Sequence, residues 1–146
     1  MAYKGKYKII NTNKYKGDYT NIIYRSLWER RFMTYCDTND SILKWSSEEI
    51  CIPYRSPLER KVRRYYPDFW LEVKKADGKK EKVLIEVKPK KQTQPPKIQK
   101  TKTTRYLKEV KTWGVNKAKW EAATAFCKKK NWRFLILTEK ELLSKK

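Results

Sequence analysis

Histidine is absent from this 146-residue sequence, and cysteine is sparse. An imidazole is the usual general base near neutral pH and a common zinc ligand. Its absence excludes Ser-His triads, histidine-metal nucleases and the usual histidine-bearing zinc sites. The three cysteines, Cys36, Cys51 and Cys127, form no C-x-x-C pair. This spacing predicts reduced, buried thiols in a cytosolic protein.

Long apolar runs are also absent from the chain. No stretch reaches the roughly 18 consecutive apolar residues that a transmembrane helix needs. Residues 1–10 alternate lysine with tyrosine and isoleucine, and they lack the apolar core of a secretory signal. We therefore expect no membrane partner.

Acidic residues are scarce relative to basic ones. Asp and Glu number 16 against 37 Lys and Arg, which gives a formal net charge of +21. A chain this basic most often binds a polyanion, and nucleic acid is the commonest one. Aromatic residues make up 14% of the chain, so it folds and is not a disordered basic tail. Its length predicts a single domain over residues 1–146.

The positive charge is concentrated in the second half of the chain. Residues 74–146 carry 23 basic and 7 acidic groups, a net +16, against +5 for residues 1–73. The first 20 or so residues are predicted to form a basic, tyrosine-rich arm. Residues 90–104 contain Pro95-Pro96 and one large apolar side chain, which predicts a mobile loop. The lysines of this loop are predicted to contact DNA phosphates: Lys90, Lys91, Lys97, Lys100 and Lys102.

Apolar spacing predicts a helix from Ser26 to about Asp37. One face carries four aromatic residues at helical spacing: Tyr24, Trp28, Phe32 and Tyr35. Ser26 and Glu29 fit the S-x-x-E capping box of a helix N-terminus. Residues 49–54 (EICIPY) have a strand pattern, and Pro53 favours a sheet edge or a strand end.

A β-hairpin around residues 68–88 is the clearest element, and its turn allows two registers. A two-residue turn would place Phe69 opposite Glu86. A three-residue turn with a left-handed Gly78 would place Phe69 opposite Ile85. Only the second register gives one coherent apolar face, made of Phe69, Leu71, Val73, Val83, Ile85 and Val87. We therefore predict the second register.

The rest of the chain is predicted to place helices before and after a further strand. Residues 104–111 are predicted as a short helix, and residues 116–130 as a firmer helix capped by Asn116. Residues 132–137 (WRFLIL) are typical of a buried strand, and a C-terminal helix is predicted to begin at Thr138. Strand, helix, strand is the order of a parallel crossover. The sequence therefore predicts an α/β fold of order αβββαβα, a mixed sheet flanked by helices.

The chosen register brings two carboxylates together with a lysine beside them. Asp68 lies opposite Glu86, and Lys88 is the next residue on the same face. Two like charges side by side are costly unless a cation neutralises them, and Mg²⁺ takes hard oxygen ligands. The metal would lower the pKa of a coordinated water and so supply hydroxide without histidine. Lys88 could orient that water and stabilise charge on a phosphate, so the pattern predicts cleavage of a phosphodiester.

These residues lie in motifs that resemble those of the PD-(D/E)XK nuclease superfamily. Residues 66–69 (YPDF) and residues 86–88 (EVK) are similar to its two signature motifs, bridged by a hairpin as that fold requires. Residues 24–29 (YRSLWE) resemble its N-terminal helix, and residues 49–54 its next strand. The start MAYxGK and residues 44–50 (KWSSEEI) most resemble the head completion nucleases of tailed phages. Phage junction-resolving endonucleases and the transposition endonuclease subunit have similar motifs.

The resemblance implies a restriction-endonuclease-like core and a set of catalytic residues. It implies Asp68 and Glu86 as metal ligands and Lys88 as the catalytic lysine. Glu29 is implied as a helix carboxylate, near the metal or holding a second one. Arg25, in the same helix motif, is expected to bind DNA. The implied cofactor is Mg²⁺, with Mn²⁺ as an alternative and no zinc.

Several of these side chains have a second interpretation. Glu29 could serve only as the third residue of a capping box. Glu48 and Glu49 are interpreted as a surface charge pair, with membership of the metal site as the alternative. Trp70 shares the face of Asp68 and is the best candidate for stacking on a base.

The resemblance implies a metal-dependent DNA endonuclease that acts in phage head completion and DNA packaging. The expected partners are DNA and the portal, neck or other head completion proteins. The expected location is the host cytoplasm during infection, with the virion as an alternative. A junction-resolving endonuclease, which needs a dimer to cut two strands symmetrically, is a second hypothesis. A third is a catalytically silent DNA-binding protein of the phage neck or head. A ribosomal-type RNA-binding module would explain the charge but not the acidic pair.

Overall fold

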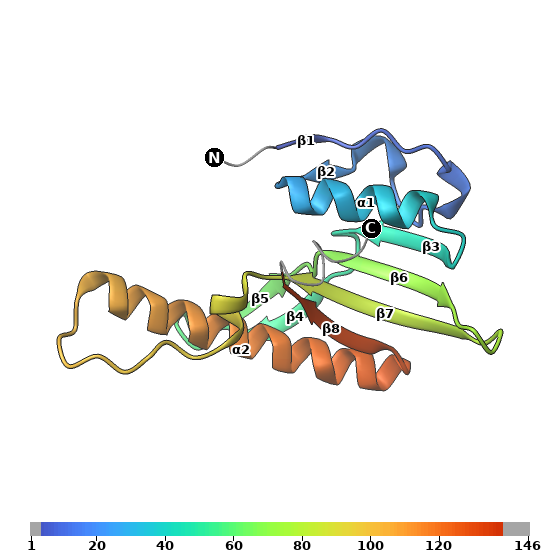
Figure 1. Ribbon diagram of the computed structural model, residues 1–146. Coiled ribbons are helices and arrows are strands. Elements are labelled where there is room, and N and C mark those ends of the chain that lie inside the picture. Colours follow the sequence, from blue (N-terminus) through green and yellow to red (C-terminus); the bar gives the residue numbers. More distant parts are fainter. Residues whose placement is uncertain (1–3, 139–146) are drawn as a thin grey trace.

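The computed structural model describes residues 4–138 as a mixed α/β protein. Its helices and strands are, in chain order, β1 (Gly5–Lys6), β2 (Ile23–Tyr24), α1 (Leu27–Thr38), β3 (Ile42–Ser47), β4 (Ile52–Arg55), β5 (Val62–Tyr65), β6 (Phe69–Lys74), β7 (Lys80–Val87), α2 (Thr104–Lys130) and β8 (Arg133–Leu137), with 3-10 turns η1 (Thr12–Lys14), η2 (Tyr19–Asn21) and η3 (Lys90–Thr93). A four-stranded sheet of order β3-β6-β7-β8 lies between α1 and α2, and β1-β2 and β4-β5 form two small sheets (Figure 1). The prediction of a mixed sheet flanked by helices is confirmed. Within the described residues, no helix is long and apolar enough to cross a membrane.

β6 and β7 pair in the register that the apolar pattern predicts. Phe69 lies opposite Ile85 in the antiparallel ladder. Gly78 has a φ of +85°, and its N–H donates to the carbonyl of Lys75, as in a three-residue turn with a left-handed glycine. The register prediction is therefore confirmed. A slip by one residue would turn the whole apolar set toward the other face, so burial selects this pairing strongly.

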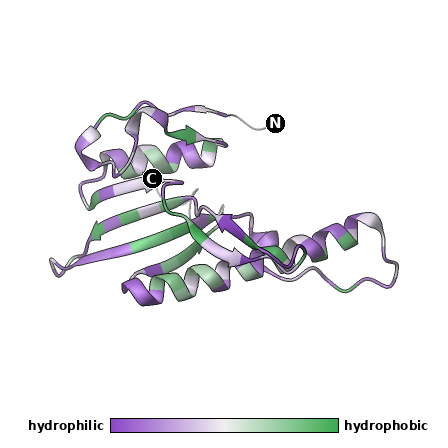
Figure 2. Cartoon of the chain, turned by 180° about the vertical axis from the view of Figure 1, so that it is seen from behind, coloured by the Kyte–Doolittle hydropathy of each residue, from purple (hydrophilic) through white to green (hydrophobic). Residues whose placement is uncertain are grey.

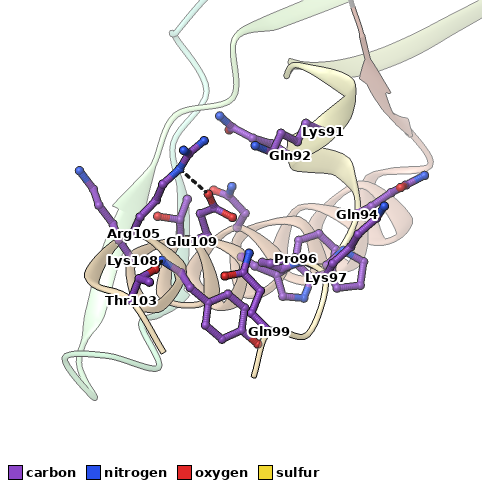
Figure 3. A pocket seen from close by; sticks show the side chains of 15 residues that line it. Lys91, Gln92, Gln94, Pro96, Lys97, Gln99, Thr103, Arg105, Lys108 and Glu109 are labelled. Atoms are coloured by element: carbon purple, nitrogen blue, oxygen red, sulfur yellow. Dashed lines mark hydrogen bonds and ion pairs between the residues drawn. The ribbon is translucent and has the colours of Figure 1, made fainter. Parts of the chain in front are cut away.

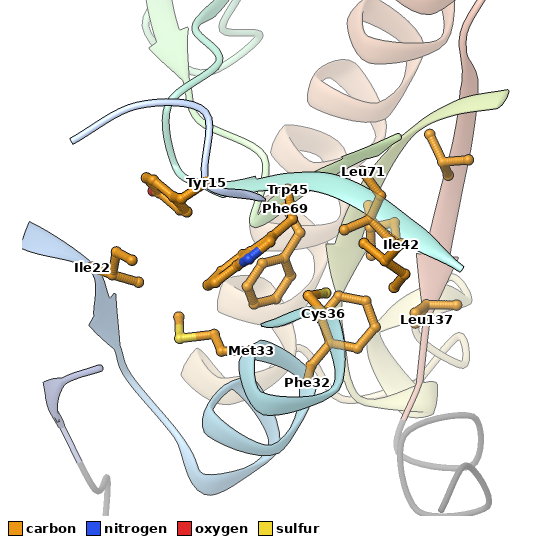
Figure 4. Packing of buried hydrophobic residues seen from close by; sticks show 12 residues of the cluster. Tyr15, Ile22, Phe32, Met33, Cys36, Ile42, Trp45, Phe69, Leu71 and Leu137 are labelled. Carbon is orange, nitrogen blue, oxygen red and sulfur yellow. The ribbon is translucent and has the colours of Figure 1, made fainter. Parts of the chain in front are cut away.

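The two faces of the sheet bury two separate hydrophobic clusters. The cluster on the α1 face includes Phe32, Met33 and Cys36 of the helix and Trp45, Phe69, Leu71, Val83 and Ile85 of the sheet (Figure 4). The cluster on the α2 face includes Trp70 and Leu84 of the sheet and Trp120, Ala123 and Cys127 of the helix. Hydrophobic residues occupy the middle of β7, and hydrophilic residues its hairpin end (Figure 2). Burial on both faces fixes the central strands β6 and β7. The candidate site lies at the end of these strands that is away from the hairpin turn.

Helix α1 begins where the capping box predicts. Ser26 adopts an extended backbone, and its hydroxyl accepts a hydrogen bond from the Glu29 N–H at 3.1 Å. This bond satisfies one of the first-turn N–H groups that have no partner within the helix. The side chains of Trp28 and Tyr35 are half-buried against the α1 cluster, while Phe32 is buried in it. The predicted aromatic face is therefore the face that packs on the sheet.

Helix α2 corrects one prediction and confirms another. The chain forms one continuous helix from residue 104 to 130, where two helices were predicted. Thr103 caps its N-terminus by accepting from the Tyr106 N–H, while Asn116 is buried in the helix interior. Asn116 therefore does not cap a helix. The parallel crossover is confirmed, because α2 connects β7 to the parallel strand β8. The helix predicted from Thr138 falls almost wholly outside the described residues.

The predicted element order is wrong in its number of strands. Five strands, β3 to β7, lie between the two helices where three were predicted. β3 was missed because its pattern ends in serines, yet Ser46 and Ser47 are buried. The backbone groups of Ser47 are satisfied by the hydroxyl of Tyr15, which donates to the Ser47 carbonyl and accepts from the Ser47 N–H. β5 was missed because three of its four residues are exposed and because, among the described strands, it pairs only with β4. Pro53 lies in that small two-stranded sheet, in keeping with the predicted edge position.

From residue 4 onward, the segment predicted as a basic arm packs closely against α1 and β3. The buried carboxylate of Asp37 accepts hydrogen bonds from the Tyr7 hydroxyl and from the Ile10 and Asn11 N–H groups, at 2.7–2.9 Å. Tyr15 is buried edge-on against the ring of Trp45. This part of the chain is therefore anchored to the core, despite its positive charge.

The cysteines follow the prediction at two of three positions. Cys36 and Cys127 are buried and Cys51 is exposed, and none of the three forms a disulfide. Cys51 precedes β4, where Ile52 is buried, and successive side chains of an extended segment alternate in direction. The prediction of burial is therefore wrong for Cys51.

Candidate active site

Asp68 and Glu86 meet at the ends of the two central strands, on the α2 face of the sheet. Asp68 immediately precedes β6, and Glu86 is the second-to-last residue of β7. The Val87 N–H donates to Asp68 Oδ2 at 2.7 Å. The Tyr65 hydroxyl donates to Glu86 Oε1 at 2.8 Å. Each carboxylate is therefore held in place by one donor on a neighbouring strand segment.

Burial and mutual repulsion both act on this carboxylate pair. Burial, followed by the charge of Glu86, raises the pKa of Asp68 to about 8. Burial also raises the pKa of Glu86, although the Tyr65 hydrogen bond and Lys88 oppose this shift. Ionising both carboxylates is therefore unfavourable unless a cation compensates them, as at a cation-binding site.

Lys88 lies on the same face of β7 as Glu86. Its Nζ is 3.7 Å from Glu86 Oε2, and 27% of its side chain is exposed. Its backbone N–H donates to the carbonyl of Leu137 in β8. The lysine is thus anchored by the sheet and reaches solvent beside the acidic pair.

Glu29 approaches the same site from the N-terminal turn of α1. Its Oε1 accepts from the Arg25 N–H at 3.1 Å, one residue before the cap. Burial raises the pKa of Glu29, and the charges of Glu48 and Glu86 raise it further. The charge of Glu29 in turn raises the pKa of Asp68. Glu29 is therefore both a capping residue and part of the electrostatic environment of the carboxylate pair.

Two further glutamates follow β3, and the structure separates them. Glu48 has a left-handed φ of +54°, and its N–H donates to the Asp68 carbonyl at 3.1 Å. Its carboxylate forms an ion pair with the Arg25 guanidinium at 3.2 Å. Glu49 accepts from the Tyr15 hydroxyl and the Asp18 N–H, so its carboxylate faces the N-terminal segment. Glu48 thus borders the site, whereas Glu49 does not, and the two are not a pair.

One charged residue at the site was missed by the sequence analysis. Lys119 of α2 is half-buried, and its charge interacts with Lys88, Glu86 and Asp68. Its Nζ lies 5.5 Å from the ring centroid of Tyr65. The only signal in the sequence is that Lys119 directly precedes Trp120, which was predicted to face inward. Its location depends on how α2 packs on the sheet.

The donor chemistry of the site fits a hard divalent cation. Carboxylate oxygens are the ligands that Mg²⁺ prefers, and one carboxylate oxygen of Asp68 accepts no hydrogen bond from the described residues. In residues 4–138, however, no three acidic or cysteine side chains converge closely enough to enclose an ion. The site therefore offers two carboxylates to a metal, and water would have to supply further ligands. Mg²⁺ sites in proteins commonly keep several waters.

Trp70 is not available for stacking on a base. Its side chain is only 3% exposed and packs against Trp132 and the α2 cluster. The prediction of a stacking role is therefore wrong. Trp70 does share a face with Asp68, but α2 covers that face at position 70.

Residues 90–104, here called the basic segment, and the first turns of α2 project from the body (Figure 1). Side chains from both line a groove (Figure 3). The groove has a volume of about 870 Å³ and includes Lys91, Lys97, Arg105 and Lys108 in its lining. The lysines at positions 91, 97, 100 and 102 are exposed. Lys90 begins η3, three positions after the end of β7. The predicted DNA-binding lysines thus follow directly from the strand that carries Glu86.

Comparison with known proteins places this geometry in context. Residues 39–139 match the family described as TnsA-like endonuclease N terminal. The head completion nuclease of Enterobacteria phage T4 is 43% identical over 143 residues. That alignment covers 95% of this chain and 93% of the phage T4 protein.

Proposed function

Since this chain belongs to the family of phage head completion nucleases and contains a TnsA-like endonuclease domain, we propose that it is a Mg²⁺-dependent DNA endonuclease. We further propose that its active site is of the PD-(D/E)XK type. Endonucleases of this family act on DNA and are typically metal-dependent. The TnsA-like domain implies a restriction-endonuclease-like fold, in keeping with the mixed sheet between two helices. We propose in addition which ion is bound and which residues bind it and catalyse cleavage.

The observation that carries the proposal is the buried pair of Asp68 and Glu86 with Lys88 beside it. A buried pair of carboxylates is costly without a cation, and here the cost is visible in the raised pKa of Asp68. A structural role alone gives no reason to bury two acids opposite each other. The pair lies at the strand ends of a strongly basic chain, beside Lys88, whose side chain is 27% exposed and could meet a phosphodiester.

We assign the roles at the site from the bonds that each residue makes. Asp68 and Glu86 would hold the metal, which when bound supplies a water of lowered pKa and neutralises charge on the phosphate. The Val87 N–H and the Tyr65 hydroxyl keep the two carboxylates in position. Lys88 would donate to the attacking water or to a phosphate oxygen.

Glu29 is proposed as the third carboxylate of the site. From the start of α1 it would bind a water of the metal or a second ion. The overall reaction forms a bond from a water oxygen to phosphorus, breaks the bond from phosphorus to one sugar oxygen, and transfers a proton to that sugar oxygen. No histidine is needed for any of these steps, in agreement with the composition.

DNA binding is assigned to the positive charge around the site. Arg25, now paired with Glu48 at 53% side-chain exposure, would exchange this partner for a phosphate. The exposed lysines of the basic segment would contact phosphates beyond the cut: Lys90, Lys91, Lys97, Lys100 and Lys102. These contacts would position the duplex without reading its sequence.

The name of the phage T4 relative supports a role in head completion. We propose that this protein processes packaged DNA during that step, with portal or neck proteins as partners. It would act in the host cytoplasm during infection. The endonuclease activity can be tested without these partners.

The test is incubation of the purified protein with linear, supercoiled and branched DNA, in Mg²⁺, in Mn²⁺ and in EDTA. We expect cleavage with Mg²⁺ that EDTA abolishes and that the Asp68→Ala variant lacks. Failure of the wild type to cleave any of the three DNAs with either metal would favour the catalytically silent binding protein. Strong preference for branched DNA, together with a dimeric solution mass, would favour the junction-resolving enzyme.

A further inference from the structure

A second lysine, Lys119, reaches the active site from the opposite layer of the molecule. It lies on α2, while Lys88 follows β7. Its Nζ is held over two aromatic rings, 5.8 Å from the centroid of Tyr54 and 5.5 Å from that of Tyr65. Aromatic faces attract ammonium groups at such distances, so the position of the charge is defined.

Tyr65 links this lysine directly to the carboxylate pair. The ring of Tyr65 lies under Lys119, and its hydroxyl donates to Glu86 Oε1 at 2.8 Å. Lys88 approaches the other oxygen, Glu86 Oε2, at 3.7 Å. Lys88 therefore approaches Glu86 directly, and Lys119 lies over the ring of the tyrosine that donates to the other oxygen of Glu86.

The positive charge of Lys119 is not neutralised by a close partner. None of the ion pairs within 4.0 Å in the described part of the chain includes Lys119. Burial, followed by the charge of Lys88, lowers its pKa, and the charges of Glu86 and Asp68 raise it. A half-buried ammonium that is held near another lysine, without an acid in contact, is arranged to receive an anion.

We propose that Lys119 is a second phosphate-binding lysine of the active site, contacting a non-bridging oxygen of the scissile phosphate from the Tyr65 side. The inference rests on the proposed nuclease function and extends it. In this arrangement Lys88, which follows β7, and Lys119, on α2, both contact the phosphate. Charge that develops on the phosphate oxygens during attack is stabilised by donors already in position, which is the most effective form of electrostatic catalysis.

The decisive variants change the charge of Lys119 and keep its packing. Lys119→Met retains the aliphatic stem over the two tyrosine rings and removes the ammonium, while Lys119→Arg retains a cation. Lys117→Met is the matched control, because Lys117 is an exposed lysine two positions away on the same helix. Thermal unfolding of each variant shows whether the fold is intact. Lys119→Gln repeats the test should the methionine variant unfold.

We expect Lys119→Met to lower kcat on the order of 10²-fold, as loss of one preorganised donor does in other enzymes. Lys119→Arg should recover part of this loss, and Lys117→Met should cleave like the wild type. Two binding measurements should move in opposite directions. In Ca²⁺, as a probe in place of Mg²⁺, the methionine variant should bind DNA more weakly. Without DNA it should bind Mn²⁺ more tightly, because a repelling charge has gone.

The outcomes separate this inference from the proposed function. A wild type that cleaves no DNA overturns the nuclease itself. A wild type that cleaves, with a Lys119→Met variant that cleaves equally fast, overturns only the role of Lys119. A variant that loses DNA affinity and Mn²⁺ affinity together also overturns it, because that pattern indicates a disrupted site.

Discussion

The two faces of the central sheet are built from the same strands and differ in what they bury. On the α1 face, alternate residues such as Phe69, Leu71 and Ile85 form a buried apolar cluster. On the α2 face, the residues between them include Trp70 and Leu84, but also Asp68 and Glu86 at the strand ends. The alternation of a strand thus lets one face specify the fold while the other carries charge for chemistry. Substitutions on the two faces should therefore separate stability from activity.

The largest effect is expected from the charged face. Asp68→Ala, Glu86→Ala and Lys88→Ala should each lower metal-dependent cleavage by on the order of 10²-fold or more, since the first two each remove a proposed metal ligand and the third removes the lysine proposed to act on the water or phosphate. DNA binding should persist, because the exposed lysines are untouched. A cleavage assay paired with a DNA-binding assay checks both statements. Near wild-type cleavage by Asp68→Ala would refute the site assignment.

The apolar face should show the converse behaviour. Leu71 is 5% exposed in the α1 cluster, and Leu71→Ala should lower the free energy of unfolding by about 2–5 kcal/mol. Cleavage per folded molecule should change by no more than a few-fold, as measured at low temperature. Urea unfolding gives the stability. If Leu71→Ala abolished cleavage without lowering stability, the apolar face would not have a purely structural role.

A pH effect on stability should come from the buried carboxylates at and near the charged face. The folded protein binds a proton at Asp68 up to a pKa of about 8, far above the ordinary aspartate value of 3.8. Between these values the folded state holds more protons than the unfolded state, so stability in EDTA should fall as the pH rises from about 4 to 8. Burial also raises the pKa of Glu86 and Glu29, with the same sign.

Thermal unfolding from pH 5 to pH 8 measures this slope. Asp68→Asn should flatten it, because the amide does not titrate. Mg²⁺ should flatten it as well if a cation binds the pair. A stability that rises over this range in EDTA, in the wild type and not in Asp68→Asn, would contradict the raised pKa.

The hairpin turn supports both faces equally. At Gly78 a side chain would meet no atom within 4 Å, so the cost of a substitution comes from the positive φ. Gly78→Val should lower the free energy of unfolding by about 1–2 kcal/mol, and Gly78→Asn by less. Cleavage per folded molecule should be unchanged, because the turn lies at the far end of the hairpin. Equal stability of the two variants would refute the left-handed turn.

The smallest effect should come from charge that lies outside both faces. Replacing Lys91, Lys97, Lys100 and Lys102 by Gln should weaken DNA binding for any sequence. For every phosphate that the protein no longer neutralises, the slope of log K against log salt should flatten by roughly 0.9 on duplex DNA. Turnover at saturating DNA should change much less.

A matched control carries four Gln substitutions at the exposed hairpin end, at Lys74, Lys79, Lys80 and Lys82. This control lowers the net charge of the chain by the same amount at a site remote from Glu86. Equal salt slopes in the two variants would show that the basic segment makes no specific contribution to DNA binding.

Sequence patterns were reliable where a single local rule decided the structure. The hairpin register followed from one apolar face, and the start of α1 from the bond between Ser26 and Glu29. Both depend on residues close in sequence. The same register predicted the meeting of Asp68 and Glu86, because only a short turn connects their strands.

The remaining features depended on contacts between distant residues. The backbone groups of the buried Ser47 in β3 are satisfied by Tyr15, some thirty positions earlier in the chain. The anchoring of the N-terminal segment depends on Asp37. Its place in the sequence does not show that it is buried or which groups it binds. Lys119 reaches the site only because α2 crosses over the sheet. No local pattern in the sequence encodes these three arrangements.

Strand β7 is paired on its two edges by partners at very different sequence separations. On one edge, the hairpin joins it to β6 through a turn of a few residues. On the other edge, the Lys88 N–H bonds to Leu137, 49 positions along the chain. Hairpins close in roughly 1–10 μs, whereas long-range parallel pairing must first overcome the entropy of closing a long loop. We therefore expect the two carboxylates to meet early in folding and the lysine beside them to be fixed last, so that the hydrolytic site is completed only as the whole chain folds.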